Sequence, residues 1–263
     1  MFDDVFLFKI FLSFLTGGIF VTITLYAAER YGPGFGGVIA GLPSTTAVGL
    51  FFIGFVQSPQ HASVASTIIP AAAGGSLVFV ISYLLLCERL GYSYALLVSS
   101  VVWFMVSLPL AFLRIDNLFV STLIFLLLWI ITLVYMRKQE MKIMSQVKIK
   151  QKPFEVIARA GFAGTVVSVA VVLSSLFGPL WGGALAAFPA MFFTTFIILC
   201  RDYGCEYSKI FAKTTPLGLF GVMPYAWGVH YFYPEYGLIV GTVISYILSF
   251  AGAGLVYAIL GRK

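Results

Sequence analysis

Runs of about twenty apolar residues follow one another along almost the whole chain. Each run is long enough to cross, as a helix, a hydrocarbon core of roughly 30 Å. Only 10% of the residues are charged, against roughly 25% in a typical soluble domain. Because an unpaired backbone polar group in lipid is costly, such runs should be helical. The sequence therefore predicts an all-α integral membrane protein.

Nine transmembrane helices are expected, and the connections between them are short with one exception. The exception, 137–153, carries most of the net charge of +6. Basic loops stay in the cytoplasm, so we expect a multi-pass cell-membrane protein with its N-terminus outside and its C-terminus cytoplasmic. The positive net charge is then explained by the orientation of the chain in the membrane, and it does not indicate nucleic-acid binding. The expected helices are 5–28, 35–56, 62–87, 92–113, 117–136, 154–177, 180–200, 206–231 and 236–260, and the basic residues of the loop are Arg137, Lys138, Lys142, Lys148, Lys150 and Lys152.

An internal repeat organises these helices. A shift of 146 residues aligns 8–104 with 154–250 without a gap, and three prolines and six glycines, the residues that dictate backbone geometry, match. We therefore expect a first four-helix repeat at 1–113, a linker helix and basic loop at 114–153, and a second repeat at 154–263. Since the single helix 117–136 separates the repeats, the second enters the membrane from the opposite face, as in the inverted repeats of many secondary transporters. The matched pairs are Pro33/Pro179, Pro43/Pro189, Pro70/Pro216, Gly18/Gly164, Gly32/Gly178, Gly36/Gly182, Gly37/Gly183, Gly75/Gly221 and Gly91/Gly237.

Four of the prolines lie about eight to ten residues into their predicted helices, near the bilayer middle. A proline there frees a carbonyl and usually kinks the helix. Either these are packing kinks, or they are hinges that open a polar cavity between the second and third helices of each repeat. The candidate hinges are Pro43, Pro70, Pro189 and Pro216, and the candidate substrate-binding residues are Lys213, Arg159, Thr45, Thr46, Thr67, Thr214, Thr215 and Tyr225.

The charges within the predicted helices bear on the substrate, because a buried charge costs at least about 2.5 kcal/mol. Lys213 is the deepest of them, and Arg159 follows Glu155 at a spacing that also permits an internal ion pair. No acidic residue occupies a helix centre, which argues against proton-coupled export of cations. The pattern favours an anion or a polar neutral metabolite.

The sequence contains no nucleophile elbow, metal-binding motif or phosphate loop. The three cysteines, Cys87, Cys200 and Cys205, have neither metal-ligand nor redox spacing. Two histidines, His61 and His230, are expected at the outer face among aromatic residues typical of a membrane interface. We therefore expect no catalytic residues, no metal and no cofactor, and not an enzyme.

The second repeat resembles the small four-helix GlpM-like inner-membrane proteins. The resemblance rests on the small residues from Gly182 to Phe188-Pro189, the charged loop Arg201-Asp202-Tyr203-Gly204, and Pro224-Tyr225, over about a hundred residues. A four-helix unit duplicated with inversion is also similar to the architecture of the drug/metabolite transporter superfamily. The chain lacks the first-helix glutamate of that superfamily's small multidrug-resistance members, which puts cationic drugs in doubt.

Together these features predict a secondary transporter or permease of a small metabolite that works by alternating access at the repeat interface. An ion or small-solute channel and a non-transporting scaffold or lipid-handling protein remain alternatives. The expected partners are a small-molecule substrate and membrane lipid, and association into a homodimer is left open by the sequence.

Overall fold

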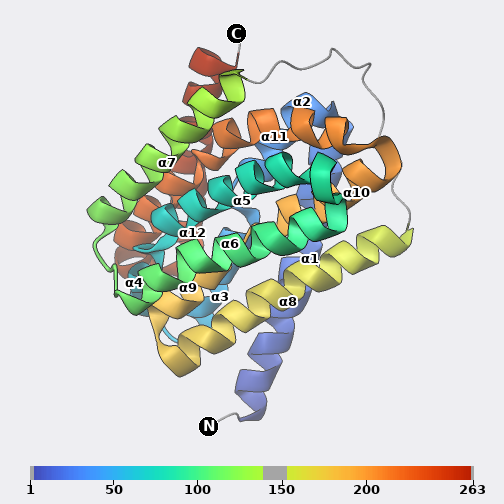
Figure 1. Ribbon diagram of the computed structural model, residues 1–263. Coiled ribbons are helices and arrows are strands. Elements are labelled where there is room, and N and C mark those ends of the chain that lie inside the picture. The colour runs from blue at the N-terminus through green and yellow to red at the C-terminus, as the bar shows by residue number, and fades with distance from the viewer. Residues whose placement is uncertain (1–2, 139–152, 262–263) are drawn as a thin grey trace.

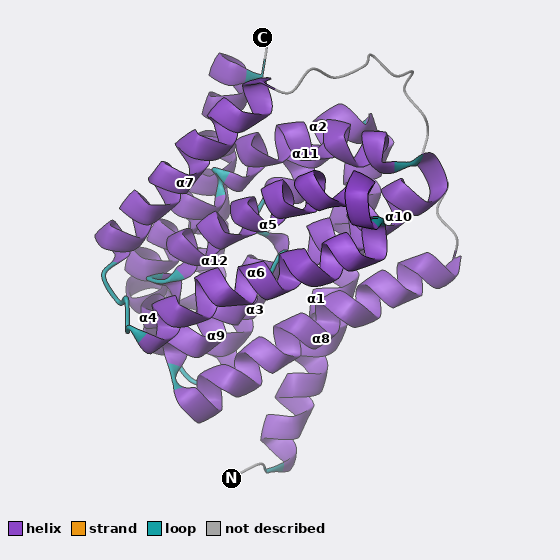
Figure 2. Ribbon diagram, viewed as in Figure 1, coloured by secondary structure: helices purple, strands orange, loops and turns teal. Residues whose placement is uncertain are grey.

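The computed structural model describes residues 3–138 and 153–261, and within these ranges it consists of twelve α-helical segments without a strand (Figures 1 and 2). Most of the basic loop lies outside the described residues. The segments are α1 (Asp4–Arg30), α2 (Gly32–Gly41), α3 (Ser44–Val56), α4 (Pro59–Ser66), α5 (Ile69–Leu90), α6 (Tyr92–Phe112), α7 (Leu118–Lys138), α8 (Pro153–Phe177), α9 (Pro179–Ala186), α10 (Ala190–Tyr203), α11 (Cys205–Leu219) and α12 (Val222–Leu260).

The described segments combine into nine crossings, because four crossings are interrupted. α2 runs into α3, α4 into α5, α9 into α10, and α11 into the first part of α12. The stretch Cys205–Leu260 has 56 residues, which would span about 84 Å as one helix. It turns back at Gly237, whose φ of 75° is a left-handed conformation that favours glycine. The expected all-α membrane fold is confirmed, and the four interrupted crossings are the four predicted helices that contain a candidate hinge proline.

The distribution of side chains is that of a membrane protein. Large apolar residues cover the outside: Phe119, Leu123 and Leu127 of α7 are all more than half exposed. Many hydroxyl side chains are instead buried between the helices, among them Ser99 and Ser245. A soluble monomer rarely exposes apolar surface on this scale, whereas lipid accepts it.

The equivalent helices α1 and α8 pack directly against each other through matched glycines. A Cβ added at Gly18 would lie 2.7 Å from the carbonyl oxygen of Ala160, and a Cβ added at Gly164 would overlap the carbonyl oxygen of Phe14. Residues 18 and 164 are 146 apart, and so are 14 and 160. The two contacts are therefore one contact made twice, with the helices running in opposite directions.

The same relation holds deeper in the molecule. Gly37 of α2 packs on the backbone of Phe211 in α11, and Gly183 of α9 packs on the backbone of Ala65 in α4. These positions also differ by 146. Gly75 packs against Ser107 of α6, and Gly221 packs against the equivalent Ala253 in the second part of α12. This pseudo-two-fold arrangement supports the predicted inverted duplication, because every pair appears in the register of the sequence shift.

Candidate functional site

Two proline turns interrupt equivalent helices at equivalent places. Pro43 separates α2 from α3 with φ −73° and ψ 59°, and Pro189 separates α9 from α10 with φ −77° and ψ 53°. The N–H after each proline donates to the carbonyl before it, at 2.7 Å within 42–44 and 2.8 Å within 188–190. Both are inverse γ-turns. The sequence reason is the proline ring, which lacks an N–H and cannot continue the preceding helix.

Each turn leaves the start of a helix without hydrogen-bond acceptors. The N–H groups of Thr45 and Thr46 in α3, and of Met191 and Phe192 in α10, have no acceptor among the described residues. The N-terminus of a helix also carries about half a unit of positive charge from the aligned peptide dipoles. Two such ends therefore offer free donors and a positive potential, which is the arrangement that binds anionic groups in many proteins.

The two turns line one small hollow at the centre of the repeat interface. Its volume is about 30 Å³, enough for only about two water molecules, since one needs roughly 10–15 Å³ of cavity volume. Thr45, which is 6% exposed, faces this hollow, and its hydroxyl has no partner among the described residues. The hollow is lined by 40–46, Ser76, 187–192, Leu219 and Val222.

The two halves of the hollow differ in polarity. In the second repeat, the carbonyls that end α9 are satisfied by Thr46, which donates to Ala186 at 3.1 Å, and by Ser76, which donates to Ala187 at 3.0 Å. The equivalents of Thr46 and Ser76 in the other repeat are Phe192 and Val222, which cannot donate. The second-repeat turn is thus held by side chains, whereas the end of α2 receives no such bond from its counterparts.

Polar contacts between the repeats close the molecule on one side of the hollow. Ser63 of α4 donates to the backbone carbonyl of His230 in α12 at 2.7 Å, and His230 Nδ1 lies 3.1 Å from the carbonyl oxygen of Ser63. We call this pair the outer contact. It is expected on the extracellular side, where both histidines were placed by the sequence.

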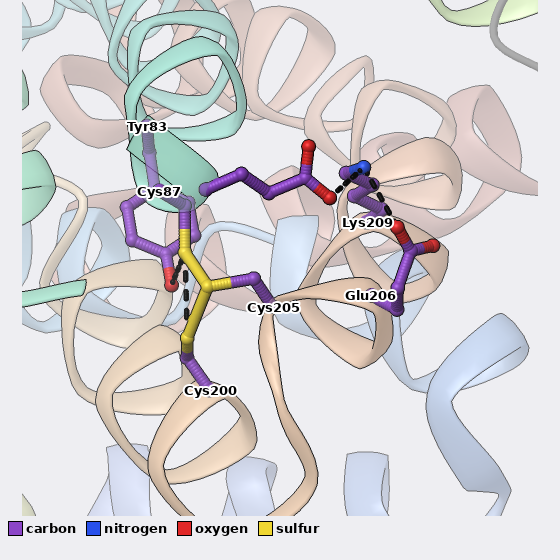
Figure 3. A network of polar contacts seen from close by, with 7 residues as sticks. Tyr83, Cys87, Cys200, Cys205, Glu206 and Lys209 are labelled. Atoms are coloured by element: carbon purple, nitrogen blue, oxygen red, sulfur yellow. Dashed lines mark hydrogen bonds and ion pairs between the residues drawn. A yellow bond between two sulfur atoms is a disulfide. The ribbon is translucent and has the colours of Figure 1, made fainter. Parts of the chain in front are cut away.

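A second polar contact between the repeats lies on the other side of the hollow. Lys209 of α11 donates to Glu88 at the end of α5 at 2.6 Å, and to Glu206 at 2.9 Å (Figure 3). We call this group the inner contact. Ser63 and Lys209 are 146 residues apart, so both contacts join the third helix of one repeat to the third helix of the other. The partners His230 and Glu88 are not equivalent positions, since the shift of 146 matches them to Leu84 and Pro234, which lie one turn away from Glu88 and His230, respectively.

A second matched pair ties the first helix of each repeat to the end of its second. Lys9 donates to the carbonyl of Phe55 at 3.1 Å, and Glu155 forms an ion pair with Arg201. Positions 9 and 155, and 55 and 201, are again 146 apart. Glu155 therefore has a structural partner on α10, in addition to its neighbourhood with Arg159 on α8.

The structure brings four predicted residues to the hollow: Pro43, Pro189, Thr45 and Thr46. Arg159 is buried on α8 and does not line the hollow. Lys213, predicted to be the deepest charge, is exposed and lines a different hollow of about 400 Å³, between Arg137 of α7 and the end of α12. The side chain of Lys213 therefore points outward from α11 and away from the hollow at the proline turns.

The remaining predicted residues lie elsewhere. The hydroxyls of Thr67, Thr214 and Thr215 bond to carbonyls of their own helices, the packing role open to any membrane threonine. Tyr225 is buried within α12, 3.5 Å from the hydroxyl of Tyr233.

The two other predicted hinges also differ from each other. Pro70 lies in the first turn of α5, just after the break that follows α4, whereas Pro216 lies inside α11, which continues to Leu219. Of these two prolines, only Pro70 lies at a break, whereas the break after α11 comes at Phe220 and Gly221, beyond Pro216.

Two polar residues of the hollow, Ser44 and Ser76, were not among the candidate binding residues, although Ser44 belongs to the hydroxyl residues expected at the depth of the prolines. Ser44 directly follows the first proline turn, and its hydroxyl lies 2.7 Å from the sulfur of Met191. Ser76 directly follows the matched Gly75 and also accepts from Trp103 Nε1 at 3.2 Å. Their position in the sequence could have indicated them, since each directly follows a proline or glycine that recurs in the other repeat.

No protein-family model, no curated protein and no solved structure matches the chain.

Proposed function

We propose that the protein is a secondary transporter of a small metabolite, which binds where the two proline turns meet. The observation that carries this proposal is the pair of equivalent inverse γ-turns around one central hollow. Broken membrane helices with free backbone groups at mid-depth are the usual building elements of substrate sites in carriers made of inverted repeats. Irregular backbone at that depth is otherwise costly, because lipid cannot satisfy it.

The chemistry of the hollow favours an anionic group, such as a carboxylate, or a polar neutral one. The first turns of α3 and α10 supply unpaired N–H donors, and the hydroxyl of Thr45 supplies a further donor. A charge placed at one helix end gains roughly 0.3–1 kcal/mol, and up to about 2 kcal/mol when partly buried. Two helix ends can thus attract an anion without a buried lysine, and the proposal needs neither Lys213 nor Arg159.

The size of the hollow favours a carrier over a channel. A volume of about 30 Å³ admits only about two water molecules, so a metabolite requires the repeats to move apart. The outer and inner contacts are candidates for the two gates, because each joins the two repeats on one side of the hollow. Alternating access then consists of opening one contact while the other stays closed.

The orientation proposed is the one expected from the basic loop. The end of α7, which precedes that loop, lies beside the C-terminus, while the N-terminus lies at the opposite end of the molecule (Figure 1). With the loop in the cytoplasm, Lys209 and Glu88 face inward and His230 faces outward. The likeness to GlpM-like proteins and to the drug/metabolite transporter architecture belongs to the same proposal.

Flux into proteoliposomes tests the proposal. We expect saturable uptake of at least one labelled small carboxylate from a panel of mono- and dicarboxylates, with counterflow when the unlabelled compound is inside. Thr45→Val removes the free hydroxyl at the hollow and should lower the uptake rate. Thr24→Val is the matched control, since Thr24 is on α1 and bonds only to its own helix. Conductance without saturation would favour a channel. If no compound is transported, the proposal is wrong and a non-transporting scaffold or lipid-handling protein is favoured.

A further inference from the structure

Three sulfur atoms that are far apart in the sequence meet at one point of the fold. The Sγ atoms of Cys87, Cys200 and Cys205 all lie within 4.8 Å of one another, and those of Cys87 and Cys200 are 3.3 Å apart. Cys87 comes from α5 in the first repeat, while the others come from α10 and α11 in the second. Figure 3 shows the three side chains pointing toward one another.

A single disulfide does not account for this arrangement. Cys205 Sγ is within bonding contact of both Cys87 and Cys200, yet a sulfur atom forms only one disulfide bond at a time. Any one bridge leaves the third sulfur as a thiol beside it. In the orientation proposed above, the cluster also faces the cytoplasm, where thiols are kept reduced. The two disulfide bonds drawn at Cys205 in Figure 3 cannot both exist, and we therefore treat the three residues as thiols in the reduced protein.

The surrounding structure holds the three cysteines in place. Gly204, with φ 86°, reverses the chain between Cys200 and Cys205 and brings their Cα atoms to 4.4 Å. Lys209 binds the two carboxylates that directly follow Cys87 and Cys205, namely Glu88 and Glu206. The ion pair with Glu88 links α5 to α11, and each carboxylate is paired with the ammonium group of Lys209. The donor set left at the cluster consists of sulfur.

A hydroxyl supports the sulfurs from the membrane side. Tyr83 lies one turn before Cys87, and its hydroxyl is 3.2 Å from Cys87 Sγ. It is buried and stacked on Phe196 at 4.2 Å. Such an outer partner orients a ligand and donates to it once the ligand is a thiolate.

The scaffold itself does not require sulfur here. The pseudo-two-fold axis generates a matching place on the opposite side of the molecule, where the equivalent residues are Gly54, Pro59 and Tyr233. That place is built without a cysteine, and Tyr233 there bonds to Thr242 at 2.7 Å. Of the two equivalent places in the repeated fold, only this one contains cysteines.

We propose that Cys87, Cys200 and Cys205 form a three-thiolate site for a soft metal ion of the Cu(I) class, beside the inner contact. Sulfur-only donors select soft ions over hard ones, and binding deprotonates the thiols. The site is independent of the transported substrate and does not rest on the proposed transport function. The proposal differs from the expectation of no metal, which was based on the spacing of the cysteines along the chain.

Titration of the reduced, detergent-purified protein with Cd²⁺ under anaerobic conditions tests the site. Cd²⁺ is a redox-inert probe whose thiolate complexes absorb in the ultraviolet. We expect the absorption to saturate at one ion per chain, and Cu(I) added afterwards to displace the Cd²⁺. Hard Mg²⁺ in excess should not displace it.

Single variants assign the ligands. Cys200→Ser and Cys205→Ser, at half-buried positions, and Cys87→Ser should each abolish saturation at the concentration that fills the wild type. Met105→Leu, which removes an exposed sulfur from α6, should bind normally. Elution as a single species in size exclusion shows that a variant is folded. Absence of the band in the reduced wild type, or full binding by any folded cysteine variant, overturns the proposal.

Discussion

Replacing Gly164 by alanine should destabilise the protein, and replacing Gly18 should do the same. A Cβ at Gly18 would lie 2.7 Å from the carbonyl oxygen of Ala160, where ordinary contact needs about 3.4 Å. The helices α1 and α8 must then separate by roughly 0.7 Å, and the obstacle is backbone. Overpacking of this kind costs about 1–3 kcal/mol. Alanine returns up to about 1 kcal/mol through its higher helix propensity.

The matched control lies on the same helix. Gly161 of α8 has nothing within 4 Å of its Cβ position, so Gly161→Ala should stabilise by about 0.5–1 kcal/mol. Since both variants gain the helix propensity of alanine, Gly164→Ala and Gly161→Ala should differ by the overpacking cost of about 1–3 kcal/mol, or roughly 2–12 °C in melting temperature. Thermal unfolding in detergent, followed by scanning fluorimetry, measures this difference. Equal melting temperatures for the Gly161, Gly164 and Gly18 variants would refute the α1–α8 contact and, with it, the pseudo-two-fold arrangement.

Three further substitutions have definite expected outcomes. Lys213→Ala should leave the uptake rate in proteoliposomes close to wild type, because Lys213 lies outside the central hollow; loss of uptake would move the substrate site toward it. Gly237→Ala should cost about 1–2 kcal/mol in thermal unfolding, since φ there is 75°, and an unchanged melting temperature would contradict the turn. Ser76→Ala should cost about 1–3 kcal/mol in the free energy of unfolding by leaving the buried carbonyl of Ala187 unpaired. The control Ser99→Ala removes only a hydrogen bond within its own helix and should cost much less. Equal costs would contradict the hydrogen bond between α5 and the end of α9.

Much of the fold was predictable because lipid permits few solutions. Apolar length and backbone pairing were enough to predict nine crossings and an all-helical chain. Pro43 and Pro189 were predicted as interruptions for a local reason, because a proline in a helix interior removes a hydrogen bond whatever its surroundings. Both indeed terminate helices.

The features that the sequence could not specify depend on contacts between distant segments. The sequence gives the position of Lys213 along α11 but not the direction it faces, which is decided by α7 and α12 packing beside it. Pro216 stays within its helix, where its carbonyl accepts from Trp129 of α7 at 2.7 Å. The cysteines come together across 113 and 118 residues, a distance at which spacing patterns carry no information.

The predicted role of the outer and inner contacts is best tested by the accessibility of the hollow. In a background lacking the three native cysteines, Thr45→Cys places a thiol at the hollow, and a membrane-impermeant thiol reagent is applied to oriented vesicles from either side. We expect slow labelling when both contacts are intact. His230→Ala should then accelerate labelling from the outside only, and Glu88→Gln from the inside only. Labelling from the same side in both variants, or no change in either, would contradict alternating access between these contacts.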